Sequence, residues 1–396
     1  MKHGWRLPAG LAFPAIAWLL SAPAMPVVAS GIAAQDGVKL QGRWLISEQA
    51  AEATYAGSKV LLSFSGSSSV AADITVSNTQ RNRQDLYIAV TVDGGKPVRV
   101  GLSPGAHPDL VLASGLSPGG HVVAVRKEGE PYFGVLRFAN PRLDRNGSWR
   151  TIVDDRPIVE VIGDSDATGI CALGPDSPAV AVSLYRAEWA SETSSWVGLL
   201  EAGLAGVGHP VDMVDLAISG STAKEEAGAY DFTAYSYSNA RFAEYPKPGR
   251  AHASLVLLWG GANDLNAGGD GARSGAVSRA TLSVFQQGIY DQLHKILARN
   301  PGVKIVLLNY LDPTIPDWRP AYAQVMGLFS AAEQSQMFVL AVRDPKNLAD
   351  ACDVDPKGHP NLSMHTTWAA QILTWMMSDG TLQRLGFPAG EQWDEE

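Results

Sequence analysis

The stretch Val161-Ile162-Gly163-Asp164-Ser165 decides how the rest of the chain is interpreted. Two β-branched residues lead into a Gly-Asp-Ser turn, which places a serine hydroxyl at the carboxyl end of a predicted strand. Ligands bind at this edge of a parallel α/β sheet, because the loops there open a crevice above the strand ends. Ser165 is therefore a candidate nucleophile. The alternative is a plain polar turn leaving a strand, and the remaining sequence has to decide between the two.

The chain from residue 151 onward alternates predicted strands with predicted helices. Such alternation predicts a doubly wound parallel sheet with helices on both faces, that is, a three-layer α/β domain. The predicted strands cover residues 158–162, 211–218, 255–259, 304–308 and 337–342, and the helical segments begin at 196 or cover 282–296, 322–332 and 363–377.

The preceding part, residues 38–149, has the pattern of short strands separated by turns rich in Gly, Ser and Pro. Its clearest signal is the run Leu86–Val92, which enters Asp93-Gly94-Gly95 and returns through Val98, the signature of a hairpin. This pattern predicts an all-β jelly-roll sandwich. We therefore expect a leader at 1–34, a β-sandwich domain at 35–150 and a catalytic domain at 151–396.

The first residues predict export. Lys2, His3 and Arg6 precede an apolar run over residues 7–20 and then small residues, which is the order found in a secretory signal peptide. A membrane anchor is the alternative, but the run falls short of the roughly 20 apolar residues that span a bilayer. We expect cleavage near Ala29 or Ala34, a periplasmic or secreted protein, and no membrane span after cleavage. The net charge of -9 argues against nucleic acid as a partner.

Each later strand of the α/β part is also followed by a polar cluster. Ser219-Gly220-Ser221-Thr222 follows the second strand, Gly261-Ala262-Asn263-Asp264 follows the third, and a block ending in His359-Pro360-Asn361 precedes the last helix. An acyl-transfer serine needs a base, for which histidine is suited, and donors for the oxyanion that forms in the tetrahedral intermediate. The chain has candidates for all of these.

The blocks GDS, SGS, GAND and CDVDPKGHPN, in this order, resemble those of the SGNH hydrolases in the GDSL family. The resemblance covers about residues 158–375 and implies a flavodoxin-like fold. It implies Ser165 as nucleophile, the backbone N–H groups of Ser165 and Gly220 with the Asn263 amide as oxyanion donors, and His359 as base.

Segments of the β-rich part, such as 60–66, 90–94, 115–121 and 126–134, are similar to the jelly-roll domain of carbohydrate esterase family 2. This second resemblance implies an enzyme that removes acetyl groups from xylan or glucomannan without metal, so the expected partner is an acetylated carbohydrate. We expect a monomer without a cofactor. Alternatives are an esterase for acetylated bacterial envelope or exopolysaccharide glycans, a lipid or aryl esterase, and a non-catalytic glycan-binding protein.

The sequence departs from the family pattern at two places. Asp166 follows the serine where the family has an apolar residue, and both Asp353 and Asp355 precede His359. A carboxylate beside the histidine would hold its tautomer. We favour Asp355 over Asp353 by proximity to His359, and a backbone carbonyl, as in some members, is the third alternative.

The remaining candidates lie around this block. Two cysteines in an exported protein are expected to pair, so Cys171 and Cys352 are predicted to join two active-site loops, with free thiols as the alternative. A sugar-stacking wall is predicted from aromatic residues, with Trp318 as the first substrate contact and with core placement favoured for Trp259. Tyr310 belongs to the same group. Asp164 and Asp264 are expected to fix turns, and His365 to be structural.

Overall fold

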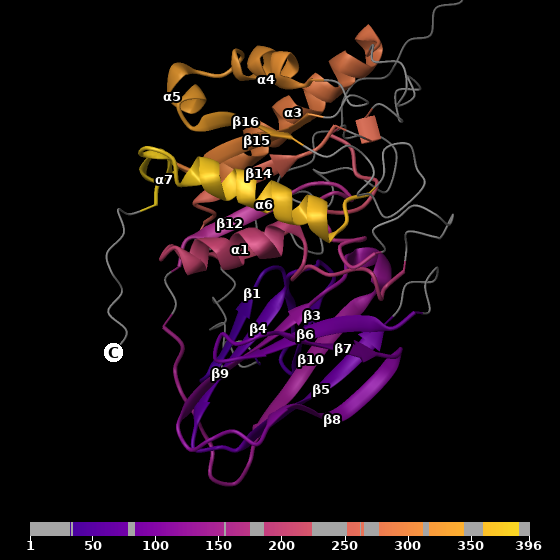
Figure 1. The fold of residues 1–396 in the computed structure, drawn as a ribbon, viewed down its shortest axis with the longest axis vertical. Coiled ribbons are helices and arrows are strands. Elements are labelled where there is room, and N and C mark those ends of the chain that lie inside the picture. The colour runs from indigo at the N-terminus through magenta and orange to yellow at the C-terminus, as the bar shows by residue number, and fades with distance from the viewer. Residues whose placement is uncertain are drawn as a thin grey trace, which may run out of the picture.

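The computed structural model describes residues 32, 35–77, 84–153, 156–174, 186–223, 252–261, 263–264, 277–311, 317–343 and 359–387. They form a β-sandwich followed by an α/β unit, and the two lie against each other, with helix α1 (Trp196–Gly206) nearest the sandwich (Figure 1). The predicted leader, except Ile32, lies outside the described part of the chain. So do the Gly-rich, low-complexity segment 267–272 and the residues Asp353, Asp355 and Cys352.

The sandwich consists of two antiparallel sheets. One has the order β1-β4-β9-β6-β7, with β11 paired to β4, and the other has the order β2-β3-β10-β5-β8. Their strands are β1 (Val38–Gln41), β2 (Leu45–Ile46), β3 (Ala50–Ala53), β4 (Lys59–Ser65), β5 (Ser69–Ser77), β6 (Leu86–Val92), β7 (Val98–Leu102), β8 (Gly105–Ser114), β9 (Gly120–Lys127), β10 (Val135–Leu143) and β11 (Ser148–Trp149).

Alternating side chains of these strands fill the space between the two sheets. Along β5 every second residue is buried, from Val70 to Val76, which is the period of a strand with one face on a core. The predicted hairpin is present, with Val90 opposite Val98. The all-β sandwich predicted from the sequence is confirmed.

The α/β unit has a five-stranded parallel sheet in the order β13-β12-β14-β15-β16. Its first strand, β12, lies between β13 and β14, so the chain moves to one side of β12 and then to the other. Such a reversal of strand order opens a ligand crevice at the carboxyl ends of the strands. The strands are β12 (Ile158–Ile162), β13 (Asp212–Asp215), β14 (Leu255–Trp259), β15 (Lys304–Leu311) and β16 (Met337–Arg343).

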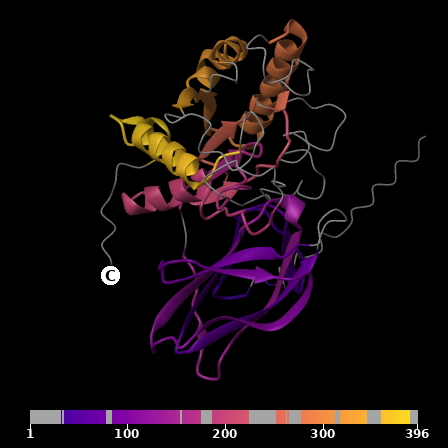
Figure 2. The same ribbon diagram turned by 45° about the vertical axis from the view of Figure 1, so that its right-hand side comes forward.

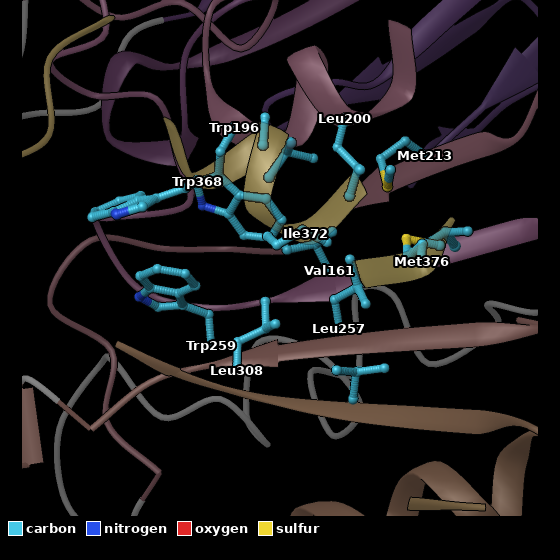
Figure 3. Close-up of a cluster of buried hydrophobic side chains, with 14 of the residues drawn as sticks. Val161, Trp196, Leu200, Met213, Leu257, Trp259, Leu308, Trp368, Ile372 and Met376 are labelled. Atoms are coloured by element: carbon cyan, nitrogen blue, oxygen red, sulfur yellow. The ribbon is translucent and has the colours of Figure 1, made fainter. Parts of the chain in front are cut away.

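Helices cover both faces of this sheet, as the sequence predicted. Figure 2 shows α1 and α6 on one side of the strands and α3 with α4 on the other. Successive residues of β12 point to opposite layers, since Val161 packs with α1 and α6 while Ile162 packs with α3. Figure 3 shows the core that lies between the sheet and helices α1 and α6. The remaining helices are α3 (Arg279–Arg299), α4 (Arg319–Met326), α5 (Ala331–Gln334), α6 (Leu362–Met376) and α7 (Thr381–Arg384).

Local signals account for several helix ends. The Ser195 side chain accepts a hydrogen bond from the Gly198 N–H and caps α1, and α3 ends at Arg299, with Asn300 as its C-cap just before Pro301. The amphipathic segment predicted at 322–332 is two short helices, because Gly327 ends α4 and a Ser330–Glu333 capping box starts α5. In the part of the chain that the structure describes, no helix is both long and apolar enough to cross a membrane.

The sandwich and the α/β unit meet through buried charges. The carboxylate of Glu201 in α1 accepts a hydrogen bond from Lys59 of β4 on one oxygen and from Arg126 of β9 on the other. Burial alone would raise the pKa of the Glu201 carboxyl, but Arg126 and Lys59 outweigh burial and lower it to about 2. The interface is therefore an ion-paired contact that fixes α1 against the sandwich.

Candidate active site

Ser165 lies in a tight turn at the carboxyl end of β12. The Asp164 side chain accepts a hydrogen bond from the Asp166 N–H at 3.1 Å, and its backbone carbonyl accepts from the Ala167 N–H at 3.0 Å. The Thr168 hydroxyl donates to the Ser165 carbonyl at 3.1 Å. These bonds fix the backbone on both sides of the serine, so the turn role predicted for Asp164 is confirmed.

His359 comes to this turn from the far end of the sequence. Its Nε2 atom lies 3.0 Å from the Oγ atom of Ser165. The ring stands just before α6, where Asn361 caps the helix by accepting from the Met364 N–H at 3.2 Å. A ring nitrogen at this distance can take the proton of the hydroxyl.

The segment after β13 lies against the serine turn. The Ile218 N–H donates to the Gly163 carbonyl at 3.0 Å, and the Ser221 hydroxyl donates to the same carbonyl at 3.0 Å. Between them, Gly220 has a φ of 81°, a left-handed conformation that favours glycine. The structure thus brings the Gly220 loop, defined as residues 218–221, beside the candidate nucleophile.

Asn263 approaches from the opposite side, after β14. Its Nδ2 atom lies 3.1 Å from the Ser221 carbonyl oxygen and 3.4 Å from Oδ2 of Asp164. Its amide is therefore placed between the serine turn and the Gly220 loop. Asp264 does more than fix its own turn, since its carboxylate accepts from the Ala223 N–H and joins this loop to the segment after β13.

Carboxyl groups crowd the serine turn. Burial raises the pKa of Asp164 well above its usual range, and the charge of half-buried Asp166 raises it further, whereas the charge of His359 opposes the shift. The Asp166 carbonyl also accepts from the indole N–H of Trp196 at 3.1 Å. Asp166 therefore acts electrostatically on Asp164 and anchors the turn to α1.

A residue of the sandwich also reaches the site, although no catalytic residue was predicted in this domain. Glu130 is buried, and its carboxylate accepts from both the N–H and the hydroxyl of Ser219, at 2.8 and 2.6 Å. The available signal was the charged run 126–130, of which three members, Lys127, Glu128 and Glu130, are buried.

The structure corrects the prediction that tryptophans form a sugar-stacking wall. Trp318 is 2% exposed and stacks on Phe285 with ring centroids 4.0 Å apart. Trp259 is equally buried, in agreement with the core placement favoured for it, and contacts Trp196 and Trp368 (Figure 3). Neither indole presents a face to a ligand, because neighbouring aromatic rings cover them.

Two further sequence candidates are placed as follows. Cys171 is buried and disulfide-bonded, and the sequence has one other cysteine, Cys352, which is outside the described residues. His365 is fully buried in α6, where its Nδ1 atom accepts from the Trp196 N–H at 3.1 Å, which is a structural position as predicted.

Ser165 and His359 are in contact at the carboxyl end of β12, where the strand order β13-β12-β14-β15-β16 changes direction. This fold and this pair of residues define a serine hydrolase of the SGNH class. Two family models match the chain: the carbohydrate esterase 2 N-terminal model over residues 40–152, and the GDSL-like Lipase/Acylhydrolase family model over residues 161–369. The second match spans more than half of the sequence, so the chain belongs to the GDSL-like lipase/acylhydrolase family. It is a carboxylic ester hydrolase.

Solved structures share the whole architecture. A family two carbohydrate esterase from Clostridium thermocellum in complex with cellohexaose has a TM-score of 0.68 and 17% identity, covering 88% of this chain and 100% of that one. An acetyl xylan esterase from the rumen bacterium Butyrivibrio proteoclasticus has a TM-score of 0.69 and 15% identity, and the match covers 89% of this chain and 98% of that one. A family two carbohydrate esterase with a carbohydrate-binding domain from Corynascus thermopiles (Myceliophthora fergusii) has a TM-score of 0.65 and 20% identity. The match covers 88% of this chain and 100% of that one.

At these identities the likenesses establish a shared fold, and that fold includes the sandwich as well as the catalytic unit. A search of curated protein sequences finds no match.

Proposed function

We propose that the protein is an exported serine esterase that removes O-acetyl groups from a polysaccharide through an acetyl-enzyme on Ser165. The observation that carries the proposal is the 3.0 Å contact between His359 Nε2 and Ser165 Oγ at the carboxyl edge of the sheet. The contact pairs a nucleophile with its base, which is the arrangement that covalent ester hydrolysis requires.

In the first half of the reaction, the Ser165 oxygen attacks the acetyl carbonyl carbon while its proton passes to His359. The resulting oxyanion accepts hydrogen bonds from the backbone N–H groups of Ser165 and Gly220 and from the Asn263 amide. The bond between the acetyl carbon and the sugar oxygen then breaks, and this oxygen takes the proton from His359.

In the second half, water attacks the acetyl-enzyme and gives a proton to His359. When the tetrahedral intermediate collapses, the Ser165 oxygen leaves and recovers that proton, and acetate is released. The Asn263 amide nitrogen makes two contacts, one with the Ser221 carbonyl at 3.1 Å and a longer one with Asp164 at 3.4 Å. The amide hydrogen on the Asp164 side is therefore the one that we assign to the oxyanion.

The polysaccharide class rests on the family match of the sandwich and on the solved relatives, one of which is named for acetyl xylan and another of which holds cellohexaose. Export rests on the charged, apolar and small-residue order of the first 30 residues. Both are proposals for this chain.

The test is acetate release, measured over a panel of acetylated xylan, glucomannan, peptidoglycan and bacterial exopolysaccharide, with nitrophenyl esters of increasing chain length beside them. The proposal predicts the highest kcat/KM on xylan or glucomannan and none with Ser165→Ala. Faster turnover of the envelope glycans would reassign the substrate, and a preference for long acyl chains would indicate a lipid esterase. Unchanged activity of Ser165→Ala would refute the mechanism.

A further inference from the structure

Glu130 is held firmly at the point where β9 passes into β10. It precedes the short 3-10 helix Pro131–Phe133, and its carbonyl accepts from the Phe133 N–H at 3.1 Å. The buried ammonium of Lys127 donates to the carbonyls of Gly129 and Glu130. These bonds within the sandwich fix the backbone at Glu130.

The Glu130 carboxylate uses both oxygens on one residue of the catalytic unit. Oε2 accepts from the Ser219 N–H, and Oε1 accepts from its hydroxyl. Two bonds to one residue fix its orientation, and the peptide that follows Ser219 carries the N–H of Gly220. The direction of a candidate oxyanion donor thus depends on a side chain of the sandwich.

The other side of the Gly220 loop is fastened within the catalytic unit, by the bonds of Ile218 and Ser221 to the Gly163 carbonyl. Gly220 itself is exposed, and among the described residues no atom would lie within 4 Å of a Cβ atom at this position. In this part of the chain, the loop is held by the Glu130 bonds before Gly220 and by the Ser221 bond after it.

The carboxyl group of Glu130 also interacts electrostatically with His359. Burial raises the pKa of its carboxyl, whereas the two bonds from Ser219 and the charges of Lys127 and His359 lower it. A carboxylate that interacts favourably with a charged His359 also favours the imidazolium that forms when the serine gives up its proton.

We infer that Glu130 is a positioning residue for the Gly220 loop, whose backbone N–H binds the oxyanion, so that the β-sandwich completes the active site. This inference rests on the proposed function. Glu130 touches no substrate and acts through Ser219 and Gly220. Its loss should therefore lower kcat and leave KM nearly unchanged, because the oxyanion exists only in the transition state and the intermediates that follow it.

The test compares Glu130→Gln with Glu128→Gln on an acetyl ester. Glu128 is a matched control, because it is equally buried on the same segment and also crosses to the catalytic unit, but it accepts from Ser191 and Thr193 instead. We expect kcat to fall by about 10-fold to 100-fold in Glu130→Gln, the order that misplacing a catalytic group costs. Glu128→Gln should keep the wild-type kcat.

A double-mutant cycle with Ser219→Ala checks the route. Ser219→Ala alone should lower kcat, and it should have little further effect in the Glu130→Gln background, because both changes remove the bond that the Ser219 hydroxyl donates to the Glu130 carboxylate. If Glu130→Gln does not fold, Ser219→Ala still tests the inference through its kcat and KM. Independent effects, or a Ser219→Ala enzyme with wild-type kcat, would contradict it.

The proposed function and the positioning role of Glu130 can be refuted separately. A wild-type protein without esterase activity would refute the proposed function. An active wild type in which Glu130→Gln and Glu128→Gln have the same kinetics would refute the positioning role alone.

Discussion

Ser165 Oγ and His359 Nε2 lie 3.0 Å apart although 194 residues separate them in the sequence. The contact is made by two segments that the sheet brings together: the turn after β12 and the entry to α6. It is the centre of the proposed chemistry.

Replacing the base should leave a folded but slow enzyme. We expect His359→Gln to lower kcat by about 100-fold to 10,000-fold, the usual contribution of a positioned general base. His107→Gln is the control, since His107 lies in the sandwich and bonds the Ser103 carbonyl. Steady-state kinetics on an acetyl ester measure both. Equal activity of the two variants would show that His359 is not the base.

Gly220 and Gly208 allow backbone strain to be separated from catalysis. Their φ angles are 81° and 83°, and at both positions an added Cβ meets no atom of the described residues within 4 Å. Alanine at either should cost about 1 to 2 kcal/mol of unfolding free energy, because an L-residue is strained in this conformation. Only Gly220→Ala should lower kcat. Denaturant titration and kinetics check this, and a matching loss of kcat in Gly208→Ala would mean that general destabilisation is the cause.

The ion pair at the domain interface should matter for stability. Glu201→Gln leaves Lys59 and Arg126 without their shared carboxylate, which should cost about 3 to 5 kcal/mol of unfolding free energy for buried charges. Asp109→Asn breaks a pair with Arg142 in which the Asp109 side chain is 80% exposed, and it should cost about 1 kcal/mol or less. Urea unfolding compares them, and equal losses would contradict the importance of burial.

His365 should make the fold sensitive to acid. Burial lowers the pKa of its imidazole from 6.5 to about 3, so the unfolded chain binds a proton on it before the folded one does. Its stabilising contribution is complete above pH 6.5 and is lost as the pH falls toward 3, by about 1.4 kcal/mol per pH unit. His365→Gln should therefore show a shallower fall of Tm over this range. An unchanged slope would show that other groups control acid unfolding.

The sequence predicted the parts of the structure that depend on local pattern. The hairpin signature around Asp93-Gly94-Gly95 predicted β6 and its partner. The polar blocks at strand ends predicted which loops meet at Ser165, because parallel strands bring their carboxyl ends to one edge. Strand β8 gave no such signal, since it contains Pro108 and only Leu112 of its residues is buried.

Features that depend on packing between distant parts could not be predicted. Trp318 follows a Pro-rich segment and resembles a loop residue, yet its ring packs into the core, where it leaves no room for a side chain on Gly261. The role of Glu130 depends on how the sandwich docks on the catalytic unit, and no local pattern of charges contains that information.

Covalent labelling can show whether Ser165 is the nucleophile. The folded protein is treated with a serine-reactive phosphonate and digested, and the peptides are mapped by mass spectrometry, with His359→Gln treated in parallel. We expect one modified residue, Ser165, and much slower labelling of the variant. A label on another serine, or no label on the folded wild type, would show that Ser165 is not the nucleophile.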